Sequence, residues 1–310
     1  MSSSNLLKRK EEKHKKLINK IFTSKKNNIK NDKKILDELS INNKNTFYSD
    51  EELKMINEEN YKIVKDNSLI QKSKFDFTEL ELKSLNYTLS KLKPNKIYNE
   101  NDWIEYPLKD LLKMLNLKNG TASTELIKES LHNLRSKGKW IKIENENKIV
   151  DLSFFQNCEI ANIDNKNIVR VRFMKPILDY MQNLKKYFTS QYLVYSMRLT
   201  GKYAIRLYEL CKSYQNNYIK ELNINGFNFY IDKIKKIWCL PDTYRTNDIK
   251  RILEKSIKEI NIKTDIKISI YNTHKNGVKI DYYTLQIELN NNFYKIYKDI
   301  EKERKQKLLK

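Results

Sequence analysis

Glycine, cysteine and histidine are all scarce in this chain of 310 residues, and each shortage excludes a class of site. Five glycines, with no GxxxxGKS or GxxxxGKT run, leave no loop that could wrap a phosphate in backbone amides. The three cysteines are odd in number and lack paired spacing, which is typical of a reducing compartment and provides no disulfide or zinc framework. His14, His132 and His274 are too far apart in sequence to indicate a metal or catalytic cluster. We therefore predict no metal, no cofactor and no catalytic residue.

Long apolar runs are absent as well. The N-terminal sequence MSSSNLLKRKEEKHKK lacks the apolar core of a secretory signal, and no stretch is long and apolar enough to span a bilayer. We expect a cytoplasmic protein with no membrane partner. Tyrosine is plentiful, at 20 residues, and nicking enzymes use a tyrosine nucleophile. Those enzymes usually pair it with a metal-binding histidine cluster, which this sequence lacks, so we predict that the protein is not an enzyme.

Positive charge is what the sequence has in excess. Lysine and arginine number 61 against 39 acidic residues, a formal net charge of +22. Such an excess attracts polyanions, and nucleic acid is the polyanion that we expect, bound with a strong dependence on salt. Coding bias is an alternative source of part of the basicity, because the chain is rich in lysine, asparagine and isoleucine together.

The order of predicted elements indicates an α+β protein with two tandem winged-helix domains. Residues 1–69 are rich in Lys, Asn and Glu, and we expect a largely flexible basic arm, with a solvated tail of no function as the alternative. Residues 70–199 are expected to form the first domain and 200–290 the second, with a boundary at Thr200-Gly201. Residues 291–310 read as a basic C-terminal tail.

The first predicted domain begins with a leucine-rich helix. From Leu80 to Leu92 leucines recur at three- and four-residue intervals, which predicts a helix that Asp76 or Thr78 caps and Pro94 ends. A zipper-like dimer seam is the alternative, and packing on the domain's own core is favoured over it.

A helix-turn-helix and a hairpin are expected next. A strand at residues 104–106 leads to a helix at 108–115, and Thr121 or Ser123 is expected to cap a second helix that Gly138 ends. WIKIE and KIVDLSFF then flank a polar ENEN turn, which predicts a β-hairpin. This order is that of a winged helix. The alternating IVRVRF sequence predicts a further strand. A helix is expected over ILDYMQNLKKY, and together with the following YLVYSMRL it closes the first domain and leads to the second.

The second half repeats the order of elements without visible sequence identity. YAIRLYELCKSY predicts a helix, a strand is expected near Phe227 to Phe229, and IDKIKKIWCL predicts another helix that ends at Leu240-Pro241-Asp242. The next helix carries a buried stripe of Ile249, Ile252, Leu253, Ile257 and Ile260. Two alternating strands around Asn276-Gly277 then predict a hairpin.

Two sequence segments resemble those of one protein family. LTGKYAIRLYELCKSY, followed by RILEKSIKEINIKTDIKISI, resembles the initiator Rep proteins, plasmid replication initiators that bind iterons, and the resemblance covers about residues 70–290. It implies two winged-helix domains. It also implies monomers that bind direct repeats at a plasmid origin, help to open adjacent AT-rich DNA, and recruit the host replication initiator and helicase. Dimers formed through the first domain would repress the protein's own gene at an inverted repeat.

The resemblance places most base contacts in the second domain, on a recognition helix from near Arg245 to Ile260. Arginine suits guanine or phosphate, asparagine suits adenine, and lysine suits phosphate. The predicted DNA contacts of this domain are Arg245, Thr246, Asn247, Lys250, Arg251 and Lys255 on the helix, with Lys275 and Lys279 on the hairpin. Asp248 lies within this surface, where it could accept from cytosine or cap the helix and repel phosphate.

The first domain is expected to position the protein on DNA through phosphate contacts. Its predicted contacts are Ser123, Thr124, Lys128 and Arg135. Glu125 and Glu129 on the same helix oppose tight binding. The function predicted is therefore replication initiation on double-stranded DNA by a monomer in equilibrium with a homodimer. A double winged-helix transcriptional regulator without origin function is the alternative, and tandem direct repeats beside the gene would distinguish the two.

Overall fold

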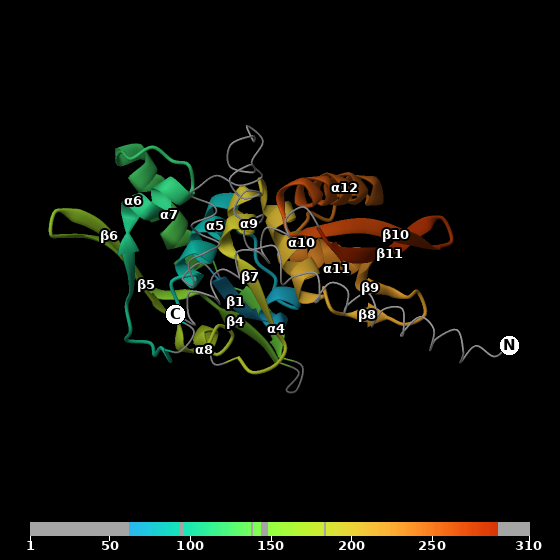
Figure 1. The fold of residues 1–310 in the computed structure, drawn as a ribbon, viewed down its shortest axis with the longest axis horizontal. Coiled ribbons are helices and arrows are strands. Elements are labelled where there is room, and N and C mark those ends of the chain that lie inside the picture. Colours follow the sequence, from blue (N-terminus) through green and yellow to red (C-terminus); the bar gives the residue numbers. More distant parts are fainter. Residues whose placement is uncertain (1–61, 94–95, 138, 144–147, 183, 291–310) are drawn as a thin grey trace, which may run out of the picture. The chain divides into compact units, whose positions relative to one another are not determined.

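The computed structural model of the chain describes residues 62–290, except 94–95, 138, 144–147 and 183 (Figure 1). The predicted C-terminal tail and most of the predicted N-terminal arm lie outside these residues. Regular structure is present within the range assigned to the arm, since strand β1 (Lys62–Asp66) lies inside that range and helix α4 (Asn67–Gln71) crosses its end. Ile63 and Leu69 of these elements are buried.

The first winged helix runs from helix α5 to strand β6. Its elements are α5 (Glu79–Leu89), β2 (Ile104–Pro107), α6 (Leu108–Met114), α7 (Thr121–Ser136), β5 (Phe155–Ile163) and β6 (Lys166–Phe173). The three strands form one antiparallel sheet in the order β2-β6-β5. The β5–β6 hairpin is therefore the wing, and β2 pairs with its second strand.

The wing is not the hairpin that the sequence predicts. WIKIE and KIVDLSFF do form an antiparallel pair, β3 (Lys139–Ile143) with β4 (Lys148–Leu152), but this pair is a separate two-stranded sheet. Strand β5 was missed because its sequence, FQNCEIANI, lacks a clean alternation of apolar and polar residues. The signal that could have found it is Asp164-Asn165, which forms a two-residue turn with φ of 50° and 57°.

Helix α5 is buried along most of its length and packs against α7 of this domain and against α9 and α10. Thr78 caps it as predicted, and the carboxylate of Glu81 accepts a hydrogen bond from the Thr78 amide at 2.9 Å. The helix ends at Leu89, several residues before Pro94. Its leucines Leu82, Leu85 and Leu89 are all buried inside the chain's own core, so the alternative of a dimer seam here is wrong.

The expected cap of helix α7 is also wrong. Thr121 and Ser123 both lie inside the helix, and the N-cap residue is Gly120. The Thr124 hydroxyl donates to the carbonyl of Gly120 at 2.9 Å, so it bonds back along its own helix.

A short segment connects the two winged helices. It consists of α8 (Lys175–Leu178), β7 (Phe188–Tyr192) and α9 (Leu193–Arg198). The helix expected over ILDYMQNLKKY is limited to its first residues. Strand β7, which the sequence did not predict, pairs antiparallel with β1.

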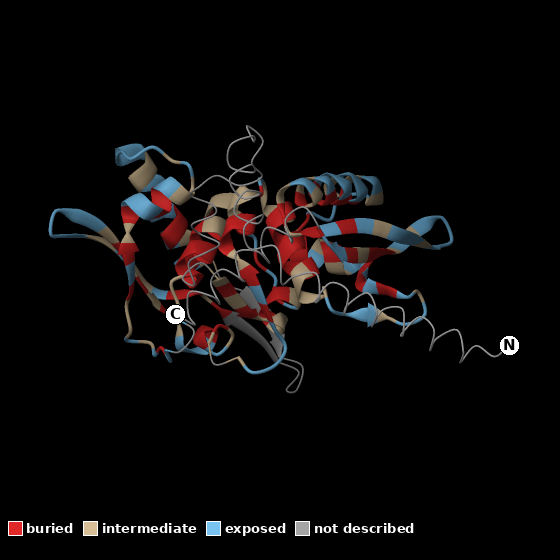
Figure 2. Cartoon of the chain, in the orientation of Figure 1, coloured by how far each residue is buried: buried red, intermediate tan, exposed pale blue. Residues whose placement is uncertain are grey.

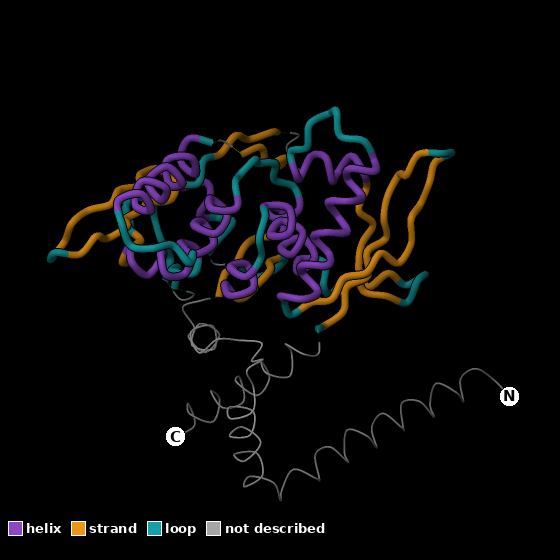
Figure 3. Tube along the Cα trace, turned by 90° about the horizontal axis from the view of Figure 1, so that it is seen from above, coloured by secondary structure: helices purple, strands orange, loops and turns teal. Residues whose placement is uncertain are grey.

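The second winged helix repeats the topology of the first. Its elements are α10 (Lys202–Ser213), β8 (Tyr218–Ile219), β9 (Ile224–Tyr230), α11 (Ile231–Trp238), α12 (Thr246–Lys263), β10 (Ile266–Asn276) and β11 (Lys279–Leu289). The sheet order is β10-β11-β9-β8, so β9 pairs with the second wing strand as β2 does in the first domain. The predicted repeat of structure is confirmed. Both wing hairpins extend beyond the helices of their own domain (Figure 3).

Helix α10 is buried along most of its length, as the run of buried residues in Figure 2 shows. It packs against α11 and α12 of the second winged helix and also against α4, α5 and β7. A helix covered by neighbours on several sides can expose few of its charges, so its polar residues need partners inside the protein.

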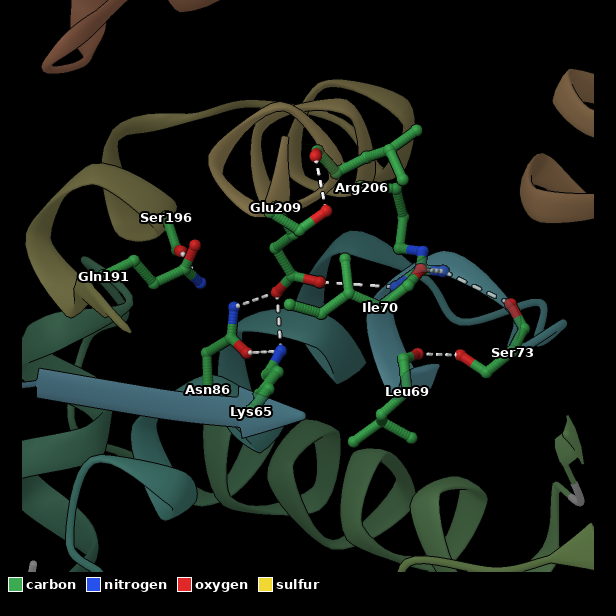
Figure 4. A network of polar contacts seen from close by, with 11 residues as sticks. Lys65, Leu69, Ile70, Ser73, Asn86, Gln191, Ser196, Arg206 and Glu209 are labelled. Carbon is green, nitrogen blue, oxygen red and sulfur yellow. Dashed lines mark hydrogen bonds and ion pairs between the residues drawn. The ribbon is translucent and has the colours of Figure 1, made fainter. Parts of the chain in front are cut away.

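Two charged residues of α10 join a buried polar network (Figure 4). The Glu209 carboxylate accepts hydrogen bonds from Lys65 of β1 at 2.6 Å and from Asn86 of α5 at 3.1 Å. Arg206 lies 3.3 Å from Glu209 and donates to the carbonyls of Ile70 and Ser73, each at 3.4 Å. The network thus connects the first helix of the second winged helix to β1, α4 and α5.

Burial and neighbouring charges shift the pKa values of Glu209 and Lys65 in opposite directions. Burial raises the pKa of Glu209, but the charges of Lys65 and Arg206 and the hydrogen bonds from Lys65 and Asn86 together lower it by more, so the carboxyl pKa lies below its ordinary value. Burial lowers the pKa of Lys65, and Glu209 offsets only part of that decrease. The Glu209 carboxylate is therefore the anion that makes two buried cations tolerable.

Gly226 allows a close approach of β9 to β11. A Cβ atom at this position would lie 1.9 Å from the backbone oxygen of Leu285. We expect Gly226→Ala to lower the free energy of unfolding by about 1–3 kcal/mol, because the two strands would have to separate. Denaturant unfolding followed by circular dichroism measures the change.

Gly120→Ser is the matched control for Gly226→Ala. A Cβ at Gly120 would meet nothing within 4 Å, and serine is favoured at a helix N-cap. We expect this variant to be as stable as the parent or slightly more stable. Equal stability of Gly226→Ala and the parent would contradict the packing described for β9 and β11.

Candidate DNA-binding surface

Helices α11 and α12 form a helix-turn-helix. Helix α11 ends where Cys239 adopts a left-handed conformation, with φ 49°, and the amide of Leu240 donates to the carbonyl of Lys235 at 3.0 Å. Pro241 follows and prevents the helix from continuing. Trp238 fixes this corner from inside, where its ring lies 5.3 Å from that of Tyr203 and 6.0 Å from that of Phe229.

Helix α12 has one buried and one exposed side. The apolar stripe predicted from the sequence is buried, apart from the half-buried Ile252. The exposed polar residues on the other side are Asn247, Lys250, Arg251, Glu254, Lys255 and Lys258. Four of these six are cations, so this side of the helix presents net positive charge to solvent.

Asp248 has a defined role in the first turn of α12. Its carboxylate accepts a hydrogen bond from the backbone amide of Arg245 at 3.1 Å, which satisfies one of the unpaired amides at the helix start. Its other oxygen accepts from the Arg251 guanidinium at 3.2 Å. Of the two roles left open for Asp248, the geometry favours capping. The same contact orients Arg251, whose side chain is 81% exposed.

The predicted contacts on the second wing lie near its tip. The turn is formed by Gly277 and Val278, and the φ of 61° at Gly277 suits the glycine position of a type II′ hairpin. The hairpin predicted from Asn276-Gly277 is therefore confirmed. Lys275 and Lys279 flank the turn and are both exposed. They lie on the same domain as α12, where a wing can reach the phosphate backbone beside the groove.

The predicted contacts of the first domain all lie on α7. Ser123 and Thr124 are half-buried, whereas Lys128 and Arg135 are exposed. Lys128 forms an ion pair with Glu125 at 2.6 Å, so part of its charge is already neutralised. On α12, Lys250 and Arg251 are likewise paired, with Glu254 and Asp248. Helix α7 presents less net positive charge than α12 because it exposes two acids beside its two exposed cations, whereas α12 exposes four cations and one acid. Contact of these residues, and of those on α12, with DNA stays a prediction.

The first wing carries one exposed cation that is not among the contacts predicted from the sequence. Lys166 is exposed and follows the Asp164-Asn165 turn of β5–β6, as Lys279 follows the turn of β10–β11. It was missed because the wing was assigned to β3 and β4. The equivalent position makes Lys166 a further candidate for a phosphate contact.

Three further kinds of feature bear on function in the part of the chain that the structure describes: metal sites, membrane-spanning helices and disulfides. Within residues 62–290, with the gaps given above, no group of three or more His, Cys, Asp or Glu side chains could hold a metal ion. None of the described helices combines the length and the apolar character needed to cross a membrane. Cys158, Cys211 and Cys239 are free thiols.

Comparison with protein families gives two matches in tandem. Residues 62–212 match the family described as Initiator Replication protein, WH1, and residues 230–287 match the family described as Initiator Rep protein, WH2. Together the two matches cover more than half of the chain and follow the order of the two winged helices.

Among curated proteins, the PI protein of Escherichia coli is 28% identical over 136 residues. The match covers 39% of this chain and 44% of that protein, so it spans less than half of the relative's length. Among solved structures, the Pi initiator protein in complex with iteron DNA aligns with a TM-score of 0.56 and 18% identity, covering 75% of this chain and 98% of that one. Domains 2 and 3 of RctB align with a TM-score of 0.39 and 10% identity, over 67% and 80% of the two chains.

Proposed function

The chain belongs to the initiator Rep protein family, and we propose on that basis that it is a plasmid replication initiator that binds direct repeats at its origin. The observation that carries the proposal is the exposed cationic side of α12, which follows a helix-turn-helix corner and lies beside a wing with two exposed lysines. The structural relative whose fold matches is described in complex with iteron DNA.

Helix α12 would enter the major groove of the repeat. A recognition helix presents its first turns to base edges, and here these turns carry Arg245, Asn247 and Arg251. Lys275 and Lys279 would bind phosphates beside the groove. Helix α7 and the β5–β6 wing would add backbone contacts, so the second domain, residues 200–290, recognises sequence while the first, residues 70–199, positions the protein.

The further steps of initiation are part of the same proposal. Bound at adjacent repeats in the cytoplasm, the protein would promote opening of the neighbouring AT-rich DNA and recruit the host replication initiator and helicase. As a homodimer joined through the first domain it would repress its own gene at an inverted repeat. It would act without cleaving DNA, because initiation by this route needs binding and not strand transfer.

A minimal plasmid tests the proposal. DNA carrying only this gene and the direct repeats beside it should replicate in a suitable host, whereas the same plasmid with a stop codon early in the gene should not. Specific binding to the repeats without replication would instead support a transcriptional regulator. Strand cleavage by the purified protein with a divalent metal would contradict the absence of enzymatic activity.

The affinity for the direct repeats should decrease steeply as the salt concentration rises. Each phosphate contact releases condensed counterions, so about six contacts would weaken binding by about 1,000-fold between 50 and 200 mM salt. Fluorescence anisotropy with a labelled repeat measures the slope. Lys279→Ala should reduce that slope by about one phosphate contact while leaving the preference for the repeat over random DNA unchanged.

A further inference from the structure

The two residues immediately before α10 form hydrogen bonds to both winged helices. Thr200 and Gly201, here called the interdomain joint, follow α9 and precede α10. The Gly201 amide donates to the carboxylate of Glu79, in the first turn of α5, at 2.7 Å. The Thr200 amide and hydroxyl both donate to one oxygen of Glu259, on α12, at 2.6 Å. One carboxylate from each winged helix therefore holds this joint.

A further contact lies beside the joint. The guanidinium of Arg198, the last residue of α9, donates to the carbonyl of Lys263 at the C-terminal end of α12, at 3.4 Å. The φ of 96° at Gly201 lies in a region that favours glycine, so the chain can reverse direction here without the strain of a side chain. The C-terminal half of α12 is thus attached to the segment that leaves the first domain.

These contacts involve the same helix that carries the candidate base contacts. Glu259 follows Arg251 by about two helical turns, so α12 is bonded to the joint near one end and exposes its cations near the other. A rigid helix transmits position along its length. The bonds from Thr200 and Arg198 therefore restrict where the N-terminal turns of α12 can lie relative to α7.

We propose that Glu259, Thr200 and Arg198 are positioning residues that set the distance along DNA between the contacts of the two winged helices. This inference rests on the proposed function, because it concerns how the repeat is read. Joining two binding modules rigidly favours the one spacing at which both engage, whereas a flexible joint tolerates several. Adding one base pair shifts the second contact by about 3.4 Å and about a tenth of a turn.

The test is a series of repeats in which base pairs are inserted between the segments that the two domains protect. Footprinting of the full-length protein first identifies those segments. One inserted base pair should weaken binding by the parent protein about 10-fold or more. The Glu259→Ala variant should bind the repeat without an insertion about 3-fold more weakly than the parent protein does. One inserted base pair should weaken binding by this variant by about 3-fold or less, so the insertion penalty is smaller than in the parent.

Matched variants separate positioning from stability and charge. Glu259→Gln keeps an oxygen that can accept from Thr200, so it should restore most of the spacing preference. Thr200→Val removes only the hydroxyl donor and should have an intermediate effect. Glu221→Ala removes the same charge from an exposed site outside α12 and should leave the insertion penalty unchanged. Thermal unfolding confirms that each variant is folded.

The possible outcomes are distinct. An insertion penalty that is equal in the parent and in Glu259→Ala would overturn the positioning role, and so would the absence of any penalty in the parent. Failure of the parent protein to bind the repeats at all would instead contradict the proposed function. A reduced penalty in Glu259→Ala that Glu259→Gln restores would support the inference.

Discussion

Arg251→Ala should weaken binding to the origin repeat by about 10- to 100-fold while leaving the free energy of unfolding almost unchanged. The side chain is 81% exposed and makes no contribution to the core. Its guanidinium is held by Asp248 on the exposed side of α12, where it can donate two hydrogen bonds to a guanine or to phosphate. Anisotropy with a labelled repeat and with random DNA measures both the affinity and the specificity.

Lys267→Ala is the control for this substitution. Lys267 is an exposed cation on β10 that lies outside the predicted contact set. Its replacement removes one charge from the same domain, so it measures the general effect of lost charge on DNA binding. We expect less than about a 3-fold change. Equal affinity of Arg251→Ala and the parent protein for the repeat would exclude Arg251 from the contact surface.

Glu209→Ala should lower the free energy of unfolding by about 3–5 kcal/mol, the largest effect on stability that we expect from a single substitution in this chain. The Glu209 side chain is fully buried, and its removal would leave Lys65 and Arg206 as buried cations without an anion. Urea unfolding of the parent and the variant measures the difference. Glu221→Ala, at an exposed position, is the control and should change stability by less than about 0.5 kcal/mol.

The pH dependence of stability provides a second measurement on Glu209. Because its pKa in the folded state lies below the ordinary value, its contribution to stability is complete above the unfolded pKa of about 4.3. That contribution is lost as the pH falls through the lower, folded pKa. The parent protein should therefore lose stability on acidification more steeply than Glu209→Gln. Parallel pH curves for the two proteins would contradict a charged Glu209 in the network.

The second winged helix was predictable because its signals are local. The stripe of α12, the Pro241 turn and the Asn276-Gly277 hairpin each depend on residues close together in sequence. The first wing was assigned to the wrong hairpin because β5 has mixed composition and is half exposed, so hydrophobic periodicity could not identify it.

The polar network and the interdomain joint were not predictable from sequence. Lys65 and Glu209 are 144 residues apart, and Thr200 and Glu259 are 59 apart, so no local pattern relates the members of either pair. Arg206 and Glu209 also resemble ordinary solvated charges of an amphipathic helix. They are buried because α10 packs against elements of both domains, and that is a property of the tertiary structure.

Helix α10 also determines where the chain can be cut or exchanged between relatives so that the fragments still fold. A fragment that ended before Lys202 would keep Lys65 but lose Glu209, the anion that compensates it, whereas one that continued to Ser213 would keep both. The family match for the first domain extends to residue 212, which includes nearly all of α10. Exchange of second domains between relatives would place α10 of one protein against β1 and α5 of another. The residues equivalent to Lys65, Asn86 and Glu209 would then have to be transferred together for the chimera to fold.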